Sequence, residues 1–176
     1  GILALGIGIG GAATFGAMFH TVNHSLTKAM LFLAAGNILA FYGTKSTTQV
    51  RGLLRTVPVT GVLWLAGFLA IVGSPPFGPF LSELTILKGM FDAGRPAVAV
   101  GYLLALAIVF VGMATIVLRM AHGSPLAGVE PTARREPLWS IAPVLALGLG
   151  VLVLGVYLPP RLADLLREAA ALLGAN

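Results

Sequence analysis

The stretch "PVTGVLWLAGFLAIVGSPPFGPFLSELTILKGMF", residues 58–91, is apolar along most of its length but has a cluster of prolines near its middle. The part up to Gly73 has 16 residues and would rise only about 24 Å as a helix. A membrane span needs about 20 residues to cross the hydrocarbon core. Proline removes backbone donors and clashes with the preceding turn. We therefore predict one membrane span made of two half-helices, with the break at Ser74, Pro75, Pro76, Gly78 and Pro79.

The segments on either side of this broken span also have the pattern of membrane helices. Glycine-rich sequence separates the first two segments, and polar loops separate the later ones. The last segment is amphipathic, as expected of a helix that rests on the membrane surface or on a partner. The other predicted helices are residues 1–10 (the end of a helix), 13–42, 97–119, 138–158 and the amphipathic 159–176. The predicted fold is all-α, a polytopic transmembrane helical bundle over residues 1–158 with a C-terminal surface helix.

The composition supports an integral membrane protein. The chain has 176 residues, of which 57% are hydrophobic and 10% charged, and its mean hydropathy is +0.96. Soluble domains carry about 25% charged residues. The net charge of +5 does not indicate nucleic-acid binding, because the basic residues lie in short loops between apolar segments. With no cysteine in the sequence, disulfides, thiolate metal sites and cysteine-bound iron–sulfur clusters are excluded from this portion.

The basic loop residues predict an orientation in the bilayer. One side carries Lys45, Arg51, Arg55, Arg119, Arg134 and Arg135, and the other carries Lys88, Arg95, Arg161 and Arg167. The positive-inside rule places the first side in the cytoplasm. The sequence begins at Gly1, inside an apolar run, and we expect it to be the C-terminal part of a longer protein.

A stripe of titratable side chains lies in "FHTVNHSLTKAMLFL", residues 19–33. His20, His24 and Lys28 are four residues apart and therefore share one narrow face of a helix. A charged residue at the bilayer centre costs at least ~2.5–3.5 kcal/mol, and such residues generally face a bundle interior or a wet cavity. The stripe therefore predicts a polar pathway for protons or ions.

The histidines allow two other interpretations. A single intramembrane histidine can simply bond to a neighbouring helix, and this remains open for either His20 or His24. Two histidines four residues apart can also ligate zinc. No cysteine or acid joins them on this helix, and the ammonium of Lys28 would oppose a cation. We expect no metal and no other cofactor here.

Glu83 is the second unexpected charge. It follows the predicted break by a few residues, in what we predict to be the first turn of the second half-helix, where free N–H groups favour a carboxylate. Broken spans occur where backbone lines a cavity or is buried in protein. Burial disfavours the charged forms of lysine and glutamate, and histidine exchanges protons near neutral pH. We predict both a capping role and, with the stripe, a proton wire of His20, His24, Lys28 and Glu83.

Two long segments carry a family resemblance. "FHTVNHSLTKAMLFLAAGNILAFYGT", residues 19–44, and "GLLRTVPVTGVLWLAGFLAIVGSPPFGPFLSELTIL", residues 52–87, resemble the antiporter-like proton-pumping subunits of complex I and the Mrp antiporters. Within that superfamily the resemblance is greatest to the F component of hydrogenase-4. It covers nearly the whole chain and is strongest over residues 10–90. It implies the C-terminal part of an inverted-repeat fold with one broken helix in each repeat.

The resemblance also implies roles and partners. His20, His24 and Lys28 match the central-axis His, His and Lys of the family, and Glu83 matches a broken-helix position occupied by Lys or Glu. It further implies a multi-pass protein in the plasma membrane of a prokaryote, with no redox centre or catalytic centre of its own. Such a protein moves protons while other membrane-bound subunits of a hydrogenase or complex I-like assembly transfer electrons.

Two alternative functions remain open. One uses the same motif residues for transport, and the other explains these residues by packing. The first is a component of an Mrp-type cation/proton antiporter without redox partners. The second is a purely structural membrane-arm subunit, in which the polar residues serve packing. The gene neighbours of the full-length protein would separate the first of these from a component of an oxidoreductase.

Overall fold

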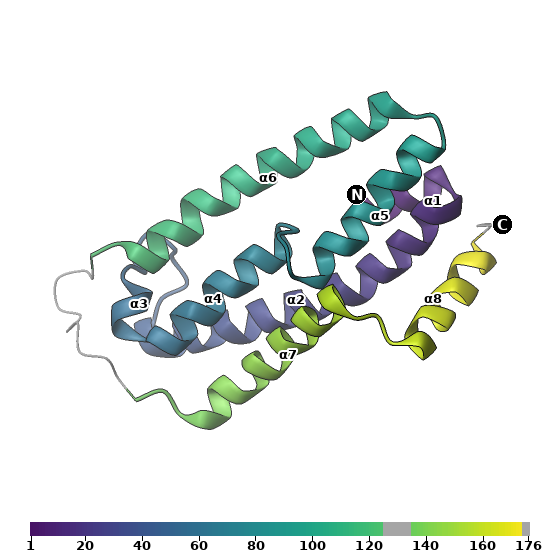
Figure 1. Ribbon diagram of the computed structural model, residues 1–176. Coiled ribbons are helices and arrows are strands. Elements are labelled where there is room, and N and C mark those ends of the chain that lie inside the picture. The colour runs from purple at the N-terminus through teal and green to yellow at the C-terminus, as the bar shows by residue number, and fades with distance from the viewer. Residues whose placement is uncertain (125–134, 174–176) are drawn as a thin grey trace.

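The computed structural model describes residues 1–124 and 135–173, and all regular secondary structure in these ranges is helical (Figure 1). The predicted all-α fold is confirmed. Arg134 and the last three residues of the predicted amphipathic segment, 174–176, lie outside the described residues. The helices are α1 (Ile2–Ile9), α2 (Gly11–Tyr42), α3 (Leu53–Thr56), α4 (Pro58–Ile71), α5 (Gly78–Asp92), α6 (Pro96–His122), α7 (Leu138–Val156) and α8 (Pro160–Leu172).

Helix α2 is the centre of the bundle and packs against α1, α4, α5, α7 and α8. Its 32 residues rise about 48 Å, more than the thickness of a bilayer core. Small residues let α5 approach it closely. A Cβ atom on Gly16 would lie 2.8 Å from the side chain of Ile86 and 3.0 Å from its backbone nitrogen. Close packing through small residues is typical of helices in membranes.

The chain is interrupted within the predicted broken span, with α4 ending at Ile71 and α5 beginning at Gly78, so Gly78 and Pro79 of the predicted break lie in the second half-helix. The two half-helices follow one another beside α2 (Figure 1). Gly73 has a φ of +68°, and the N–H groups of Gly73 and Ser74 donate to the carbonyls of Ala70 and Leu69. This is the Schellman pattern that ends helices at a left-handed glycine, and prolines commonly follow it.

The second half-helix begins earlier than the sequence predicts. Its N-cap is Phe77, in an extended conformation, and Pro79 lies in the first turn, where a missing N–H costs nothing. Glu83 therefore sits in the second turn, and the first turn contains no acidic residue. The predicted capping role of Glu83 is wrong, because the free N–H groups lie nearer to residues 78–81.

Several other boundaries differ from the sequence expectation by a few residues. Helix α2 begins at Gly11, α6 extends from Pro96 to His122, and α7 ends at Val156. The loop expected at residues 43–57 contains the short helix α3. Helices α2, α6 and α7 are long and apolar enough to cross a membrane. Helix α6 packs against α3, α4 and α5, and its outer face exposes apolar side chains, among them Val100, Leu104, Ile108 and Val111.

Helix α8 is amphipathic, but the face that it buries is rotated from the predicted one. The sequence predicts an apolar face of Leu162, Leu165, Leu166, Ala169, Leu172 and Leu173. The structure buries Ala163, Leu166 and Ala170, with Leu166 against Phe19 and Leu154, and leaves Leu165 and Leu172 exposed. The helix docks on α2. Its contacts with α2 decide which face is buried, and that face is not centred on the leucine stripe.

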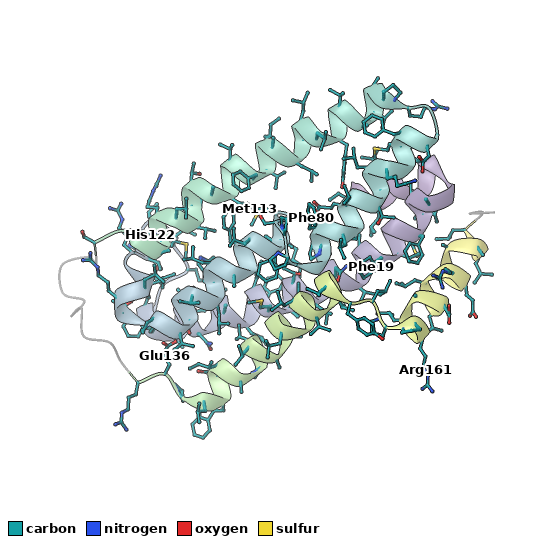
Figure 2. All side chains as sticks on the ribbon, in the orientation of Figure 1. Phe19, Phe80, Met113, His122, Glu136 and Arg161 are labelled. Atoms are coloured by element: carbon teal, nitrogen blue, oxygen red, sulfur yellow. The ribbon has the colours of Figure 1, made fainter. Side chains whose placement is uncertain are left out.

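The sequence analysis assigned the basic loop residues to two sides of the membrane, and the corresponding loops lie at the two ends of the bundle. Helix α3, the end of α6 and the start of α7 lie at one end, and the α5–α6 connection and α8 lie at the other (Figure 1). His122, at the end of α6, lies at the first of these ends, and Arg161 extends away from the first turn of α8 (Figure 2).

Candidate functional site

The stripe on α2 runs from a buried end to an exposed end. His20 is 3% exposed, His24 is half-buried and Lys28 is exposed. The two imidazole rings have their centroids 5.3 Å apart. A cavity of about 380 Å³ lies beside them, and its lining is Gly1, Ile2, Leu3, His20, Thr21, His24 and Ser25. Polar groups and space for water therefore meet at the histidine end of the stripe.

A serine connects the stripe to the broken span. Ser82 Oγ donates its hydrogen to the carbonyl of Pro79 at 2.8 Å, and the same oxygen lies 3.0 Å from His20 Nδ1. Because the only hydrogen of the hydroxyl is already used, Ser82 accepts this second bond and His20 Nδ1 carries a hydrogen. The Nε2 atom of a neutral His20 is then free to accept a proton.

An asparagine fixes the position of the break relative to the stripe. Asn23 is fully buried and lies between the two histidines in sequence. Its Nδ2 donates to the carbonyl of Gly78, the first residue of α5, at 3.0 Å. Asn23 thus joins the middle of α2 to the first turn of α5.

Glu83 is buried without a bonded partner. It is 7% exposed, and neither a hydrogen bond nor an ion pair joins its carboxylate to the rest of the described chain. The carboxylate lies against the left-handed Gly73, where a Cβ atom would collide with Glu83 Oε2. A carboxylate next to bare glycine backbone, beside a break in a membrane span, is an uncommon and costly arrangement.

The structure brings some of the predicted pathway residues together and leaves one apart. The rings of His20 and His24 are adjacent, and Ser82, the residue before Glu83, contacts His20. Lys28 lies away from them on the surface of the described chain, with Nζ 5.9 Å from the centroid of the Phe32 ring. We expected Lys28 to share a buried interior with the histidines, but in the described chain it is exposed. The stripe drifts around α2, and at Lys28 it reaches a face of the helix that no other described helix covers.

Sequence reasoning assigns no role to three residues that the structure makes important. Ser82 and Asn23 make the contacts described above, and only their nearness to Glu83 and to the histidines signals them. From the sequence, Glu136 is only a loop charge. In the structure its carboxylate accepts the N–H groups of Val59 at 2.8 Å and Thr60 at 2.9 Å, and also the Thr60 hydroxyl. It lies at the end of the bundle where α4 begins (Figure 2).

The described part of the chain forms no obvious metal centre. Within residues 1–124 and 135–173, no three side chains of the His, Cys, Asp or Glu type come close enough to hold a metal ion.

Apolar helices packed around a central helix that carries titratable side chains, with a broken span beside it, define a polytopic membrane subunit of the antiporter-like class. The family model described as "NADH:quinone oxidoreductase/Mrp antiporter, TM" matches residues 1–110. This is more than half of the 176 residues, and the chain belongs to this family.

Individual relatives agree with this assignment. The chain is 33% identical to a hydrogenase-4 component F homolog of Methylacidiphilum infernorum, over 98% of this chain and 35% of that protein. It is 30% identical to NADH-quinone oxidoreductase subunit N of Desulforudis audaxviator, over 96% of this chain and 36% of that protein. It also matches a chain in the structure of the Mrp complex from Dietzia sp., with a TM-score of 0.84 and 26% identity, over 97% of this chain and 40% of that one. The chain thus spans little more than a third of the length of these two curated relatives.

Proposed function

We propose that this chain belongs to a proton-translocating membrane component of a hydrogenase-4-like or complex I-like oxidoreductase in the plasma membrane of a prokaryote. His20, His24, Lys28 and Glu83 carry the protons, and electron transfer in partner subunits drives them. The observation that carries this proposal is Glu83, which is buried in a membrane span with no bonded partner among the described residues. It lies one residue from the serine that contacts His20.

A structural role explains Glu83 poorly. Buried polar groups that stabilise a fold are almost always hydrogen-bonded, and a buried charge without a partner destabilises it. Ionisable residues inside membrane proteins generally mark ion or proton pathways. A carboxyl group with no fixed partner can gain and lose a proton without breaking any bond that holds the fold.

The contacts support an order for the route. Lys28 is at the exposed end of the stripe, His24 and His20 follow on the same helix face, and Ser82 leads from His20 to α5. Water in the cavity beside the histidines can complete the connections, because bridging water serves nearly as well as a direct hydrogen bond. A proton passes from Lys28 along the histidines to Glu83 and leaves on the non-cytoplasmic side.

Lys28→Met tests this function, because it keeps the apolar stem and removes the titrating amine. The full-length protein in its assembled complex is placed in proteoliposomes, and proton uptake and electron transfer are measured together. We expect proton uptake to be severely reduced or lost in Lys28→Met, in a complex that still assembles. Lys45→Met is the matched control, because Lys45 is an exposed lysine just beyond the end of α2, and we expect parental pumping. Near-normal pumping by an assembled Lys28→Met complex would contradict the proposed function.

An Mrp-type cation/proton antiporter is the second candidate, favoured by the close match to a chain in the Mrp complex structure. Such a protein has no redox partners. Genes for hydrogenase subunits beside the full-length gene would favour the oxidoreductase, and genes for other antiporter subunits would favour the antiporter. Proteoliposomes separate the two directly: a component of an oxidoreductase moves protons when an electron donor is supplied, and an antiporter does so when a sodium gradient is imposed.

A further inference from the structure

Tyr102, on the helix that follows the broken span, is one of several buried polar groups without a partner among the described residues. Tyr102 of α6 is 4% exposed, and its hydroxyl has no hydrogen-bond partner among the described residues. Tyrosine hydroxyls usually find a partner when they are buried. Tyr42, at the end of α2, follows this rule, because it donates to the carbonyl of Arg51 at 2.7 Å and contacts the Thr56 hydroxyl at 2.9 Å.

Tyr102 faces the side of α5 that carries Glu83. It packs with Ile86 and Met90 of α5 in one buried cluster. Glu83 precedes Ile86 by three residues and therefore lies on the same side of α5, about one turn away. Two buried polar groups, both without a bonded partner in the described chain, are thus neighbours across the α5–α6 contact.

The described helices that pack against α5 and α6 carry few other titratable side chains. Helices α1, α4 and α7 carry none in their sequences. On α2, His20 contacts Ser82 through Nδ1, Tyr42 is bonded at the far end of the helix, and His24 and Lys28 lie toward the exposed end of the stripe. The Arg55 side chain of α3 is exposed. The remaining charges of α5 are Lys88 and Asp92, which are exposed and pair with each other at 2.5 Å. On α6, Arg119 and His122 lie in the last turn, far from Tyr102.

We propose that Tyr102 is a positioning residue for Glu83, whose hydroxyl donates a hydrogen bond, directly or through one water, to the ionised carboxylate. When Glu83 takes up a proton, its own O–H donates to the tyrosine oxygen instead. A hydroxyl can serve as donor or acceptor by rotating its hydrogen. Tyr102 keeps its proton throughout and only exchanges roles. This inference rests on the proposed function of Glu83 as a proton carrier.

Tyr102→Phe removes the hydroxyl and keeps the ring. The assembled complex is studied by infrared difference spectroscopy, and the C=O band of protonated Glu83 is assigned by its absence in Glu83→Gln. We expect this band to move to higher wavenumber in Tyr102→Phe, because the carboxyl loses a hydrogen-bond partner. Proton translocation should fall by about tenfold, the effect of one lost hydrogen bond to a charged group. Thermal stability should fall by less than in Tyr42→Phe, because the Tyr42 hydroxyl has two partners and Tyr102 has one proposed partner.

Tyr42→Phe is the matched control. It removes a hydroxyl that is bonded, and we expect lower thermal stability with an unchanged Glu83 band and unchanged translocation. An identical Glu83 band in Tyr102→Phe and in the parent would overturn the positioning role, as would a loss of stability without a band shift. If Glu83→Gln pumped normally while the band shift was present, the contact would stand and the proposed function of Glu83 would fall.

Discussion

Two glutamates lie against the two halves of the broken span, and their surroundings differ in one respect. Glu136, just before the start of α7, reaches the first turn of α4 and accepts hydrogen bonds from Val59, Thr60 and the Thr60 hydroxyl. Glu83, in the second turn of α5, is more deeply buried and bonds to none of the described residues. Both side chains carry the same functional group, so the difference lies in the donors around them.

The donors decide what each carboxylate can do. At the start of α4 the free N–H groups and the helix dipole favour a negative charge, and three donors offset the cost of removing it from water. Glu136 thereby joins the start of α7 to α4. At Glu83 the N–H group of the neighbouring Gly73 is already bonded to the Ala70 carbonyl, so no bond from this glycine fixes the protonation state. The comparison assigns the first glutamate to the fold and the second to the proposed proton transfer.

The largest expected effect is that of Glu83→Gln on transport. The amide keeps the size of the side chain but cannot carry a proton, and proton-transfer groups typically contribute about a hundredfold or more to rate. We expect proton uptake by the assembled complex in proteoliposomes to be lost or nearly lost, with no decrease in thermal stability. Glu83→Asp keeps a carboxyl group and should be milder. If Glu83→Gln took up protons at the parental rate, Glu83 would be a structural residue like Glu136.

The converse change is Glu136→Ala, which should affect stability more than transport. It removes the three hydrogen bonds that hold the start of α7 to the start of α4, and loss of a helix cap or of a bond to a charged group costs about 1–3 kcal/mol. We expect a lower unfolding free energy in detergent solution and near-parental proton uptake per assembled complex. Glu168→Ala, at an exposed position of α8, is the control and should change neither. A pumping defect in Glu136→Ala at unchanged stability would break the comparison.

The smallest effects are expected from the histidines. His20→Ala and His24→Ala should each lower proton uptake only partly, because water in the adjoining cavity can bridge a missing imidazole. His20→Ala also removes the bond to Ser82, so its defect should be the larger of the two. Proton uptake by the single and double variants measures this directly. Parental rates in all three would mean that the histidines serve packing alone, and the route would then run from Lys28 by another path.

Much of the fold could be predicted from the sequence, because it depends on local pattern. The low charge content and long apolar runs require a membrane protein, and the proline cluster after Gly73 requires a broken span. The four-residue spacing of His20, His24 and Lys28 requires one helix face. These are properties of neighbouring residues and of helix geometry. The sequence predicts the first turn of α5 too late, since proline at the start of a helix is tolerated and Pro79 begins the helix instead of preceding it.

The contacts of the site were decided only by tertiary structure. The bond between His20 and Ser82 joins residues 62 apart in sequence, and that between Thr60 and Glu136 joins residues 76 apart. The periodicity of a helix indicates which residues share a face, but the rotation and height of each helix against its neighbours decide what that face meets. The same physical reason separates Glu83, which packing placed against a glycine, from Glu136, which packing placed against three donors.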